Sequence, residues 1–213
     1  MTRVIPLFPL DLVLLPAAPL PLHIFEERYK VMLDECLEQE AEFGIVWAQE
    51  DGVARVGCTA RVAEVLKRYE DGKLDVLSQG FERFTILEVD AASRPFTQAT
   101  VEAFEDDLAT VDPSDDAEAT KSLALDLHRK LLHLLSEEAE ELDPDEDLAF
   151  ALARALPRDW DFKQRLLVSR HPAQRLRLLL DHYRELIPLL ERGERVRARA
   201  GHNGMVKNGF HPG

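Results

Sequence analysis

The chain has 213 residues and a net charge of −14, with 40 acidic residues against 26 lysines and arginines. Its hydrophobic fraction of 46% is typical of a globular protein, and a chain of this length buries a sufficient core without a metal or a disulfide. The acidic balance disfavours nucleic-acid binding, because lysine and arginine contacts to phosphate supply most of that affinity.

Nothing in the sequence indicates export or a membrane span. No apolar run reaches the roughly 18 residues that a membrane helix needs. The apolar opening at residues 4–25 contains several prolines as well as Asp11 and His23, and it lacks the basic start of a signal peptide. We therefore expect a cytoplasmic protein with no membrane partner.

The cysteines and histidines do not indicate a metal site. Cys36 and Cys58 are the only cysteines, and neither lies in a CxxC motif or near a histidine at ligand spacing. Both lie in apolar stretches, so we expect buried free thiols. His128 and His133 are five residues apart on a predicted helix and do not share a face, so we expect them to be solvated or capping. We expect no metal and no cofactor.

Residues 1–108 have the pattern of short strands with one inserted helix. Apolar runs at 4–7 and 12–15 are bounded by prolines, which indicates edge or interrupted strands. A third run at 20–25 leads into a helix whose apolar residues recur at helical spacing from Tyr29 to Leu37. Asp51-Gly52 and Asp71-Gly72 are turn signals. Further strands are expected at 43–47, 56–62, 74–77, 84–89 and 97–104.

Six to eight such strands predict a small, partly open β-barrel. Residues 109–192 predict an α-helical bundle. Helices are expected to start at Asp112-Pro113, Asp143-Pro144, Asp159 and Pro172.

The first of these helices is expected to reach about Glu141, and short links favour antiparallel packing. Its expected inward face is Leu123, Leu127, Lys130 or Leu131, and Leu134. Residues 193–213 predict a basic, Gly-rich tail. The expected fold class is α+β.

Several motifs in this order resemble the Lon protease N-terminal domain family, whose fold is PUA-like. The resemblance rests on Ile5-Pro6-Leu7-Phe8-Pro9-Leu10, Val13-Leu14-Leu15-Pro16, the run from Leu20 to Tyr29, Val56-Gly57-Cys58-Thr59-Ala60-Arg61-Val62, and Gly80-Phe81-Glu82-Arg83-Phe84 after the Asp71-Gly72 hairpin. Phe162 to Leu167, followed by Arg175-Leu176, resembles the helices of the family. The resemblance implies a PUA-like barrel followed by a helical bundle, and binding of a substrate or partner.

Motifs for catalysis are missing. The sequence has no GxxxxGK[ST] phosphate loop and no GxSxG elbow. The chain also ends before the Ser-Lys protease domain of the family would begin. We therefore expect a protein that is not an enzyme and that neither unfolds nor cleaves what it binds.

The stretch from His23 to Tyr29 is the candidate binding site, because a strand turns there into a helix and exposes backbone N–H groups. Arg28 is suited to hold a peptide carboxylate through a bidentate pair. Alternatively, Arg28 and Tyr29 lock the helix onto the barrel. The candidate peptide-binding residues are His23, Phe25, Glu26, Glu27, Arg28 and Tyr29. The acidic run at 137–147 is expected to be a solvated corner between helices.

The leading functional hypothesis is a module that binds unfolded or specific protein clients, as an adaptor or a chaperone-like holder. Such a module needs an exposed apolar patch, expected in a cleft between barrel and bundle. The alternative is RNA binding, which PUA-like modules often perform but which the negative charge opposes. A small-molecule sensor is a third possibility, since the ligase receptor cereblon contains a related Lon-like region.

Overall fold

The structure is a computed structural model of the chain, and it describes residues 1–107, 117–139 and 141–203. Two compact units divide the chain: unit 1 is Met1–Val111 with Asp143–Arg175, and unit 2 is Asp112–Leu142 with Leu176–Gly213. This grouping differs from the three consecutive segments predicted from the sequence, because residues 143–175 pack with the strand-rich part. The fold is α+β.

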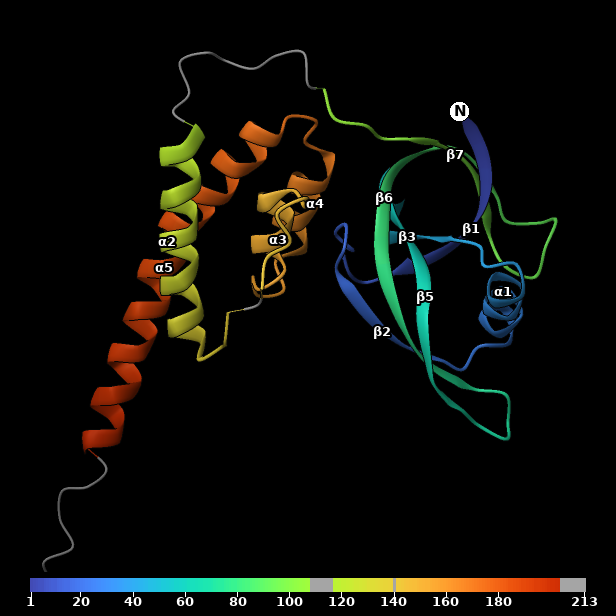
Figure 1. Cartoon of the computed structure of the whole chain (residues 1–213). Helices are drawn as coiled ribbons and strands as arrows, with labels where there is room; N and C mark the ends of the chain where they lie inside the picture. Colours follow the sequence, from blue (N-terminus) through green and yellow to red (C-terminus); the bar gives the residue numbers. More distant parts are fainter. Residues whose placement is uncertain (108–116, 140, 204–213) are drawn as a thin grey trace, which may run out of the picture. The chain divides into compact units, whose positions relative to one another are not determined.

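Seven strands form a mostly antiparallel sheet in the described part of unit 1 (Figure 1). The strand order is β1-β7-β6-β5-β3-β4, with β2 paired to β6. A parallel pairing between β1 and β3 closes the ring, where the sequence predicted a partly open barrel. The strands are β1 Thr2–Leu10, β2 Pro19–Ile24, β3 Phe43–Gln49, β4 Gly52–Val53, β5 Val56–Arg68, β6 Leu74–Asp90 and β7 Gln98–Ala103.

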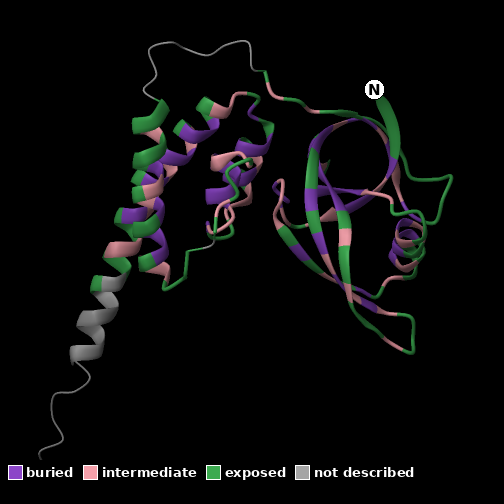
Figure 2. Ribbon diagram, viewed as in Figure 1, coloured by how far each residue is buried: buried purple, intermediate pink, exposed green. Residues whose placement is uncertain are grey.

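The strands of this ring carry both buried and more exposed residues (Figure 2). Strand residues alternate between the two faces of a sheet, so one half of each strand's side chains points inward. One core cluster consists of Ile5, Leu7, Val46, Phe84, Ile86, Ala99 and Val101. Both cysteines are buried free thiols, as predicted.

β1 is one strand that runs through Pro6 and Pro9, whereas the sequence predicted a run of 4–7 interrupted by proline. The strand changes partner at this point. Residues up to Pro6 pair antiparallel with β7, and residues from Leu7 pair parallel with β3. Proline donates no hydrogen bond, and a change of partner is a position where a strand tolerates that loss.

The strand predicted at 12–15 is absent, and this prediction was wrong. Val13, Leu14 and Leu15 are buried in the loop between β1 and β2 instead. Gly80 of β6 holds the loop, because its N–H donates to Ala18 O and its carbonyl accepts from Ala17 N. The run is apolar because it is buried, although it does not pair with another strand.

The predicted inserted helix is α1, Glu27–Glu38, which buries Tyr29, Met32, Leu33 and Cys36. The Tyr29 ring stacks on Phe8 with centroids 4.0 Å apart. The Asp71-Gly72 turn is also present, with a positive φ of 79° at Gly72. This turn connects β5 to β6. β6 is one continuous strand, whereas the sequence predicted two strands, at 74–77 and 84–89.

Two short helices complete unit 1: α3, Leu148–Ala153, and α4, Trp160–Val168. Asp159 caps α4 as predicted, since its side chain accepts from Phe162 N. α3 begins after Asp147, which accepts from Phe150 N, and the start predicted at Asp143-Pro144 was wrong. The turn at 143–147 instead carries the side chains described below.

Unit 2 contains α2, Ala117–Leu135, and most of α5, Pro172–Asn203. His128 Nδ1 lies 2.9 Å from Tyr183 Oη, and Lys130 Nζ lies 2.6 Å from Glu191. The later residue of α2, Lys130, contacts the later residue of α5, Glu191. The two helices therefore run parallel. The predicted antiparallel packing is wrong for this pair, because the long segment with α3 and α4 separates the two helices in sequence.

Four further predictions about the helical part were wrong. His128 is buried, not solvated, and α2 ends at Leu135 before the predicted Glu141. The buried face of α2 is Ala124, His128, Leu131 and Leu132, so the helix is rotated from the predicted face. α5 continues past Gly193 to Asn203, where the sequence predicted a tail. The start signal at 112–114 and residues 204–213 lie outside the described residues.

Two glycine substitutions are predicted to change stability in opposite directions. A Cβ at Gly80 would lie 2.4 Å from Leu15 O, so Gly80→Ala must displace the backbone of the buried loop. We expect Gly80→Ala to lower the free energy of unfolding by about 1–3 kcal/mol. Gly193 has nothing within 4 Å of an added Cβ on α5. We expect Gly193→Ala to raise the free energy of unfolding by up to about 1 kcal/mol.

Urea unfolding of both variants checks this pair. Destabilisation by Gly193→Ala would show that α5 does not extend through residue 193.

Candidate functional site

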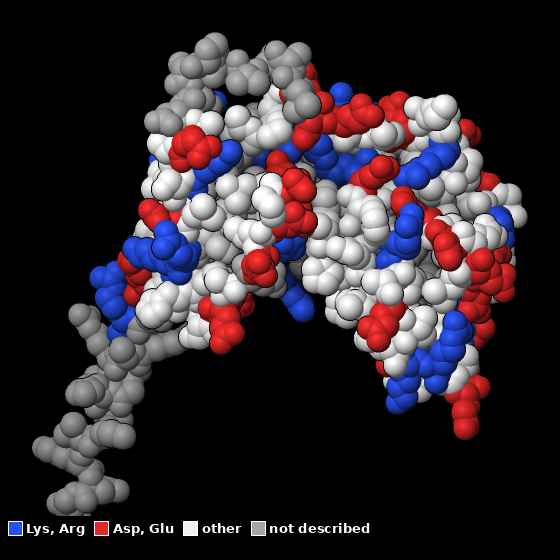
Figure 3. Space-filling model, viewed as in Figure 1, with Lys and Arg blue, Asp and Glu red and all other residues white. Residues whose placement is uncertain are grey.

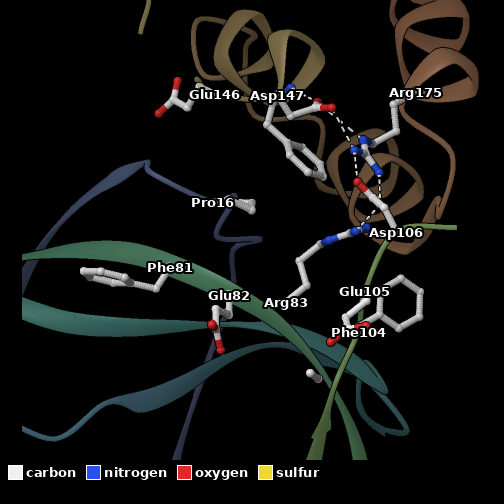
Figure 4. A pocket seen from close by; sticks show the side chains of 12 residues that line it. Pro16, Phe81, Glu82, Arg83, Phe104, Glu105, Asp106, Glu146, Asp147 and Arg175 are labelled. Atoms are coloured by element: carbon white, nitrogen blue, oxygen red, sulfur yellow. Dashed lines mark hydrogen bonds and ion pairs between the residues drawn. The ribbon is translucent and has the colours of Figure 1, made fainter. Parts of the chain in front are cut away.

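A buried ionic cluster joins the barrel to the segment 143–175 within unit 1 (Figure 4). Arg175 is 1% exposed and donates from Nη1 and Nη2 to Asp106, at 2.5 and 2.6 Å. Its Nη2 also donates to Asp147 at 2.7 Å. Arg83 of β6 pairs with Asp106 as well, and its Nη1 donates to the carbonyls of Leu167 and Ser169. The cluster therefore ties β6, the end of β7, α3 and α5 together.

The electrostatics of the cluster favour the ionised form of Asp106. Burial alone would raise the pKa of Asp106, but the hydrogen bonds and charges of Arg175 and Arg83 outweigh burial and hold that pKa below its ordinary value. The Phe150 ring lies 4.6 Å from the Arg175 guanidinium, and Phe104 lies 5.0 Å from that of Arg83. The cluster is structural in character, because its charged groups already satisfy one another.

The acidic run at 137–147 takes part in this arrangement. Asp147 caps α3 and binds Arg175, and Glu146 accepts from Arg154 Nη1 at 2.8 Å. The prediction of a solvated corner was therefore wrong at these two positions. The sequence did not show which arginines the run would meet.

A pocket of about 280 Å³ lies beside the cluster. Its apolar lining is Pro16 from the loop before β2, Phe81 from β6, Phe104 and Phe150. Carboxylates of Glu82, Glu105 and Glu146 also line it. Arg83, Asp106 and Arg175 form its charged side (Figure 4). Since those three are already paired, the pocket offers aromatic rings and glutamate carboxylates to a ligand.

The predicted site residues lie in two places in the structure. His23 and Phe25 lie together in the first. His23 Nδ1 lies 2.6 Å from Asp75 Oδ1, and Tyr69 Oη donates to Asp75 Oδ2 at 2.7 Å. The Phe25 ring stacks 6.0 Å from His23 and is 58% exposed. His23 and Phe25 therefore lie on an exposed surface with Tyr69 and Asp75, which the sequence did not single out.

The second group lies at the start of α1. Arg28 pairs with Glu26 at 2.8 Å, and its guanidinium lies 4.5 Å from the ring centroid of the buried Tyr29. Glu27 pairs with Lys30. These contacts agree with a locking role for Arg28 and Tyr29, and Arg28 already holds a carboxylate of its own chain. A peptide carboxylate would have to compete with Glu26.

A row of side chains on the outer face of the sheet leads away from His23. Asp75, Leu77, Gln79 and Phe81 alternate along β6 with buried neighbours, so they share the outward face. Pairing with β2 places His23 beside Asp75, Pro21 beside Leu77 and Pro19 beside Gln79. We call these seven residues the outer strip. The only sequence signal for it was the strand pattern at 74–77, which does not by itself indicate a binding surface.

Comparison with known protein families assigns the chain to one of them. Residues 4–185 match the family model described as the ATP-dependent protease La (LON) substrate-binding domain. The chain belongs to this family. The match runs from β1 to the middle of α5 and therefore covers the barrel, the ionic cluster and the outer strip.

Lon proteases from two bacteria are similar to the chain. That of Syntrophus aciditrophicus is 26% identical over an alignment of 207 residues that covers 88% of this chain and 26% of the protease. Lon protease 1 of Syntrophobacter fumaroxidans is 27% identical over an alignment of 215 residues that covers 93% of this chain and 26% of the protease. The chain thus spans about a quarter of the length of these relatives.

Two solved structures are also similar. A Lon N-terminal domain protein from Xanthomonas campestris has a TM-score of 0.65 and 27% identity, covering 84% of this chain and 98% of that one. The N-terminal domain of Lon protease from the Mycobacterium avium complex has a TM-score of 0.62 over 86% of this chain and 100% of that one. At 18% identity, the second shows the fold alone.

The described residues contain neither a membrane-spanning helix nor a metal-ligand group. None of their helices is long and apolar enough to cross a membrane. Likewise, the described residues hold no group of three His, Cys, Asp or Glu side chains suited to a metal ion.

Removal of Arg175 is predicted to destabilise the protein strongly. Arg175→Met leaves Asp106 and Asp147 without their main partner in a largely buried setting, so we expect the free energy of unfolding to fall by about 3–5 kcal/mol. The matched control is Arg184→Met, which removes an exposed pair with Asp181 and should cost less than about 1 kcal/mol. Equal losses in urea unfolding would contradict a structural role for the cluster.

The His23–Asp75–Tyr69 network is predicted to respond to acid. Hydrogen bonds from His23 and then from Tyr69 hold the pKa of Asp75 below its ordinary value of 3.8. A carboxyl whose pKa is lowered by folding stabilises the fold above its unfolded pKa, and this stabilisation is lost as pH falls through the folded pKa. Carboxyl NMR titration should therefore show a higher Asp75 pKa in Tyr69→Phe than in the parent protein. An unchanged pKa would exclude the Tyr69 hydrogen bond in solution.

Proposed function

We propose that the chain binds protein clients through its Lon-type substrate-binding fold and does not itself process them. The observation that carries this proposal is the family match over residues 4–185. The matched part of the two Lon proteases is the quarter that corresponds to this domain. A role as an adaptor or a chaperone-like holder in the cytoplasm, independent of ATP, follows as part of the proposal.

The architecture we propose for this function is a PUA-like barrel, residues 1–108, followed by a helical part, 109–192, of which residues 143–175 pack with the barrel, and a basic segment, 193–213. The closed ring of β1, β7, β6, β5 and β3 supports the first assignment. The helices α2 and α5 support the second. RNA binding remains the alternative, and the net charge of −14 opposes it.

The client surface we propose is the outer strip together with Phe25. Over the middle of β6, much of the surface is uncharged (Figure 3). Phe81 is 41% exposed at one end of the strip, and Phe25 is 58% exposed beyond the other. Exposed aromatic side chains bury a large apolar area when a partner covers them. The strip continues into the 280 Å³ pocket, because Phe81 lines both.

Binding through side chains is favoured over addition of a strand. A client strand pairs with an edge through backbone N–H and C=O groups. On β2, which pairs only with β6, Pro19 and Pro21 lack the N–H. Prolines on an edge strand hinder such pairing. A client therefore makes its contacts with the outward side chains.

Truncation of Phe81 is predicted to weaken client binding. We expect Phe81→Ala to raise the Kd for a reduced, carboxymethylated model protein by about tenfold, the effect of a typical interface hot spot. The matched control is Leu87→Ala, because Leu87 is 44% exposed and lies farther along β6, outside the strip. Fluorescence anisotropy with a labelled client measures both.

Equal effects of the two substitutions would place the client surface elsewhere. Absence of client binding by the parent protein would overturn the proposed function. The same titration with a single-stranded RNA at low ionic strength should give no salt-dependent signal, and a strong one would favour the alternative.

A further inference from the structure

A second pocket in unit 1, of about 420 Å³, is separate from the one beside the ionic cluster. It lies between β1, the C-terminal end of α1 and the loop from β6 to β7. Three arginines line it: Arg3 from β1, Arg61 from β5 and Arg94 from the loop. In a chain with a net charge of −14, three arginines around one pocket supply guanidinium donors that can hold a negatively charged group, although Glu35, Glu40 and Glu42 line it as well.

Within the described residues, each of these arginines donates hydrogen bonds to the protein itself from only one of its three guanidinium nitrogens. Arg3 Nη2 donates to Glu42 and Glu82, Arg61 Nη2 donates to Glu42, and Arg94 pairs through Nη2 with Glu35. Among the described residues, the Nε and Nη1 atoms of all three have no hydrogen-bond partner. The side chains are 48%, 48% and 40% exposed, so these donors are accessible.

Two of the carboxylates that line the pocket are used by these arginines. Glu42 uses Oε2 for Arg3 and Oε1 for Arg61, and its side chain is only 13% exposed. Glu35 is paired with Arg94, and Glu40 completes the acidic lining. Glu82 also binds Arg3, so carboxylates and guanidinium groups are present in similar number. An anion therefore binds through the unused Nε and Nη1 donors and not through a net positive charge.

The floor of the pocket is apolar. Ile5, Cys36 and Phe96 are 4%, 4% and 2% exposed and lie beneath the charged groups. The Arg94 guanidinium stacks 4.8 Å from the centroid of the Phe96 ring. Burial, and next the nearby Glu35, raise the pKa of Cys36 to about 11, so its thiol stays neutral at pH 7 and acts as part of the apolar floor. The pocket thus fits a carboxylate attached to an apolar side chain.

Arg61 connects this pocket to the client surface. Its guanidinium lies 5.0 Å from the centroid of the Phe81 ring, at the end of the outer strip, while its Nη2 binds Glu42 in the pocket. A client chain that follows the strip towards Phe81 reaches the arginines next. The place where the strip meets the pocket is suited to the end of that chain.

We propose that this pocket captures the C-terminal carboxylate of a client whose last side chain is apolar. The proposal rests on the proposed function and specifies it: clients that expose an apolar C-terminus bind more tightly than clients with a blocked one. The carboxylate accepts hydrogen bonds from the unused Nε and Nη1 donors, and the last side chain packs on Ile5 and Phe96. Charge-assisted hydrogen bonds from guanidinium to carboxylate supply the selectivity.

The test compares a short labelled peptide that ends in leucine, as the free acid and as the C-terminal amide, by fluorescence anisotropy with the full chain. We expect the acid to bind about tenfold more tightly, the effect of one or two hydrogen bonds to a charged group. In Arg94→Gln the acid should lose most of this advantage, because Arg94 lies in a loop and pairs only with the partly exposed Glu35. Arg55→Gln, at an exposed position outside the pocket, should retain it.

Equal binding of the acid and the amide by the parent protein would overturn the proposal, as would an absence of binding by both. An amide peptide with a penultimate glutamate separates the two sources of a carboxylate, and binding as tight as that of the acid would also overturn capture of the C-terminus. These results leave the proposed function standing as long as the carboxymethylated model protein still binds. If that client also fails to bind, the proposed function fails with it.

Discussion

The Arg175 guanidinium is the group on which the arrangement of unit 1 depends. The chain passes between the two compact units after residues 111, 142 and 175. Asp106 precedes the first passage, Asp147 follows the second and Arg175 precedes the third, so one side chain fixes the unit 1 end of all three. A buried charge is costly unless its partners are complete. Asp106, Asp147 and the Ser169 carbonyl complete it, and residues 143–175 therefore belong with the barrel.

β6 contributes to the core, to the exposed surface and to a pocket, because its two faces carry different kinds of side chain. Inward residues such as Phe84 and Ile86 belong to the barrel core. Outward residues form the strip from Asp75 to Phe81, and Arg83, beyond a register shift in the pairing with β5, joins the ionic cluster. One strand thus carries the exposed surface, one wall of the 280 Å³ pocket and the attachment of the helical segment. Gly80, between Gln79 and Phe81, lets the loop before β2 approach closely enough to shape that pocket.

Local patterns predicted the fold better than the site. The helical spacing from Tyr29, the Asp71-Gly72 turn and the Asp159 cap depend on neighbouring residues, and all three are present. The strand predicted at 12–15 was wrong, because residues buried in a loop and residues buried in a strand show the same apolar pattern. His128 and Asp147 misled because their partners, Tyr183 and Arg175, lie far away in sequence. The pocket arginines share no motif: Arg3, Arg61 and Arg94 come together only when the barrel closes.

The proposed client surface has a direction. Backbone pairing on β2 is hindered by Pro19 and Pro21, so the proposal has a bound chain held by side chains along the outer strip. Apolar contacts alone do not distinguish the two directions of a chain, since the hydrophobic effect is not directional. Hydrogen bonds to a carboxylate do distinguish them, because only one end of a polypeptide carries it. The arginines beyond Phe81 would therefore set the orientation, while Phe25 and Phe81 contribute the area that holds the chain.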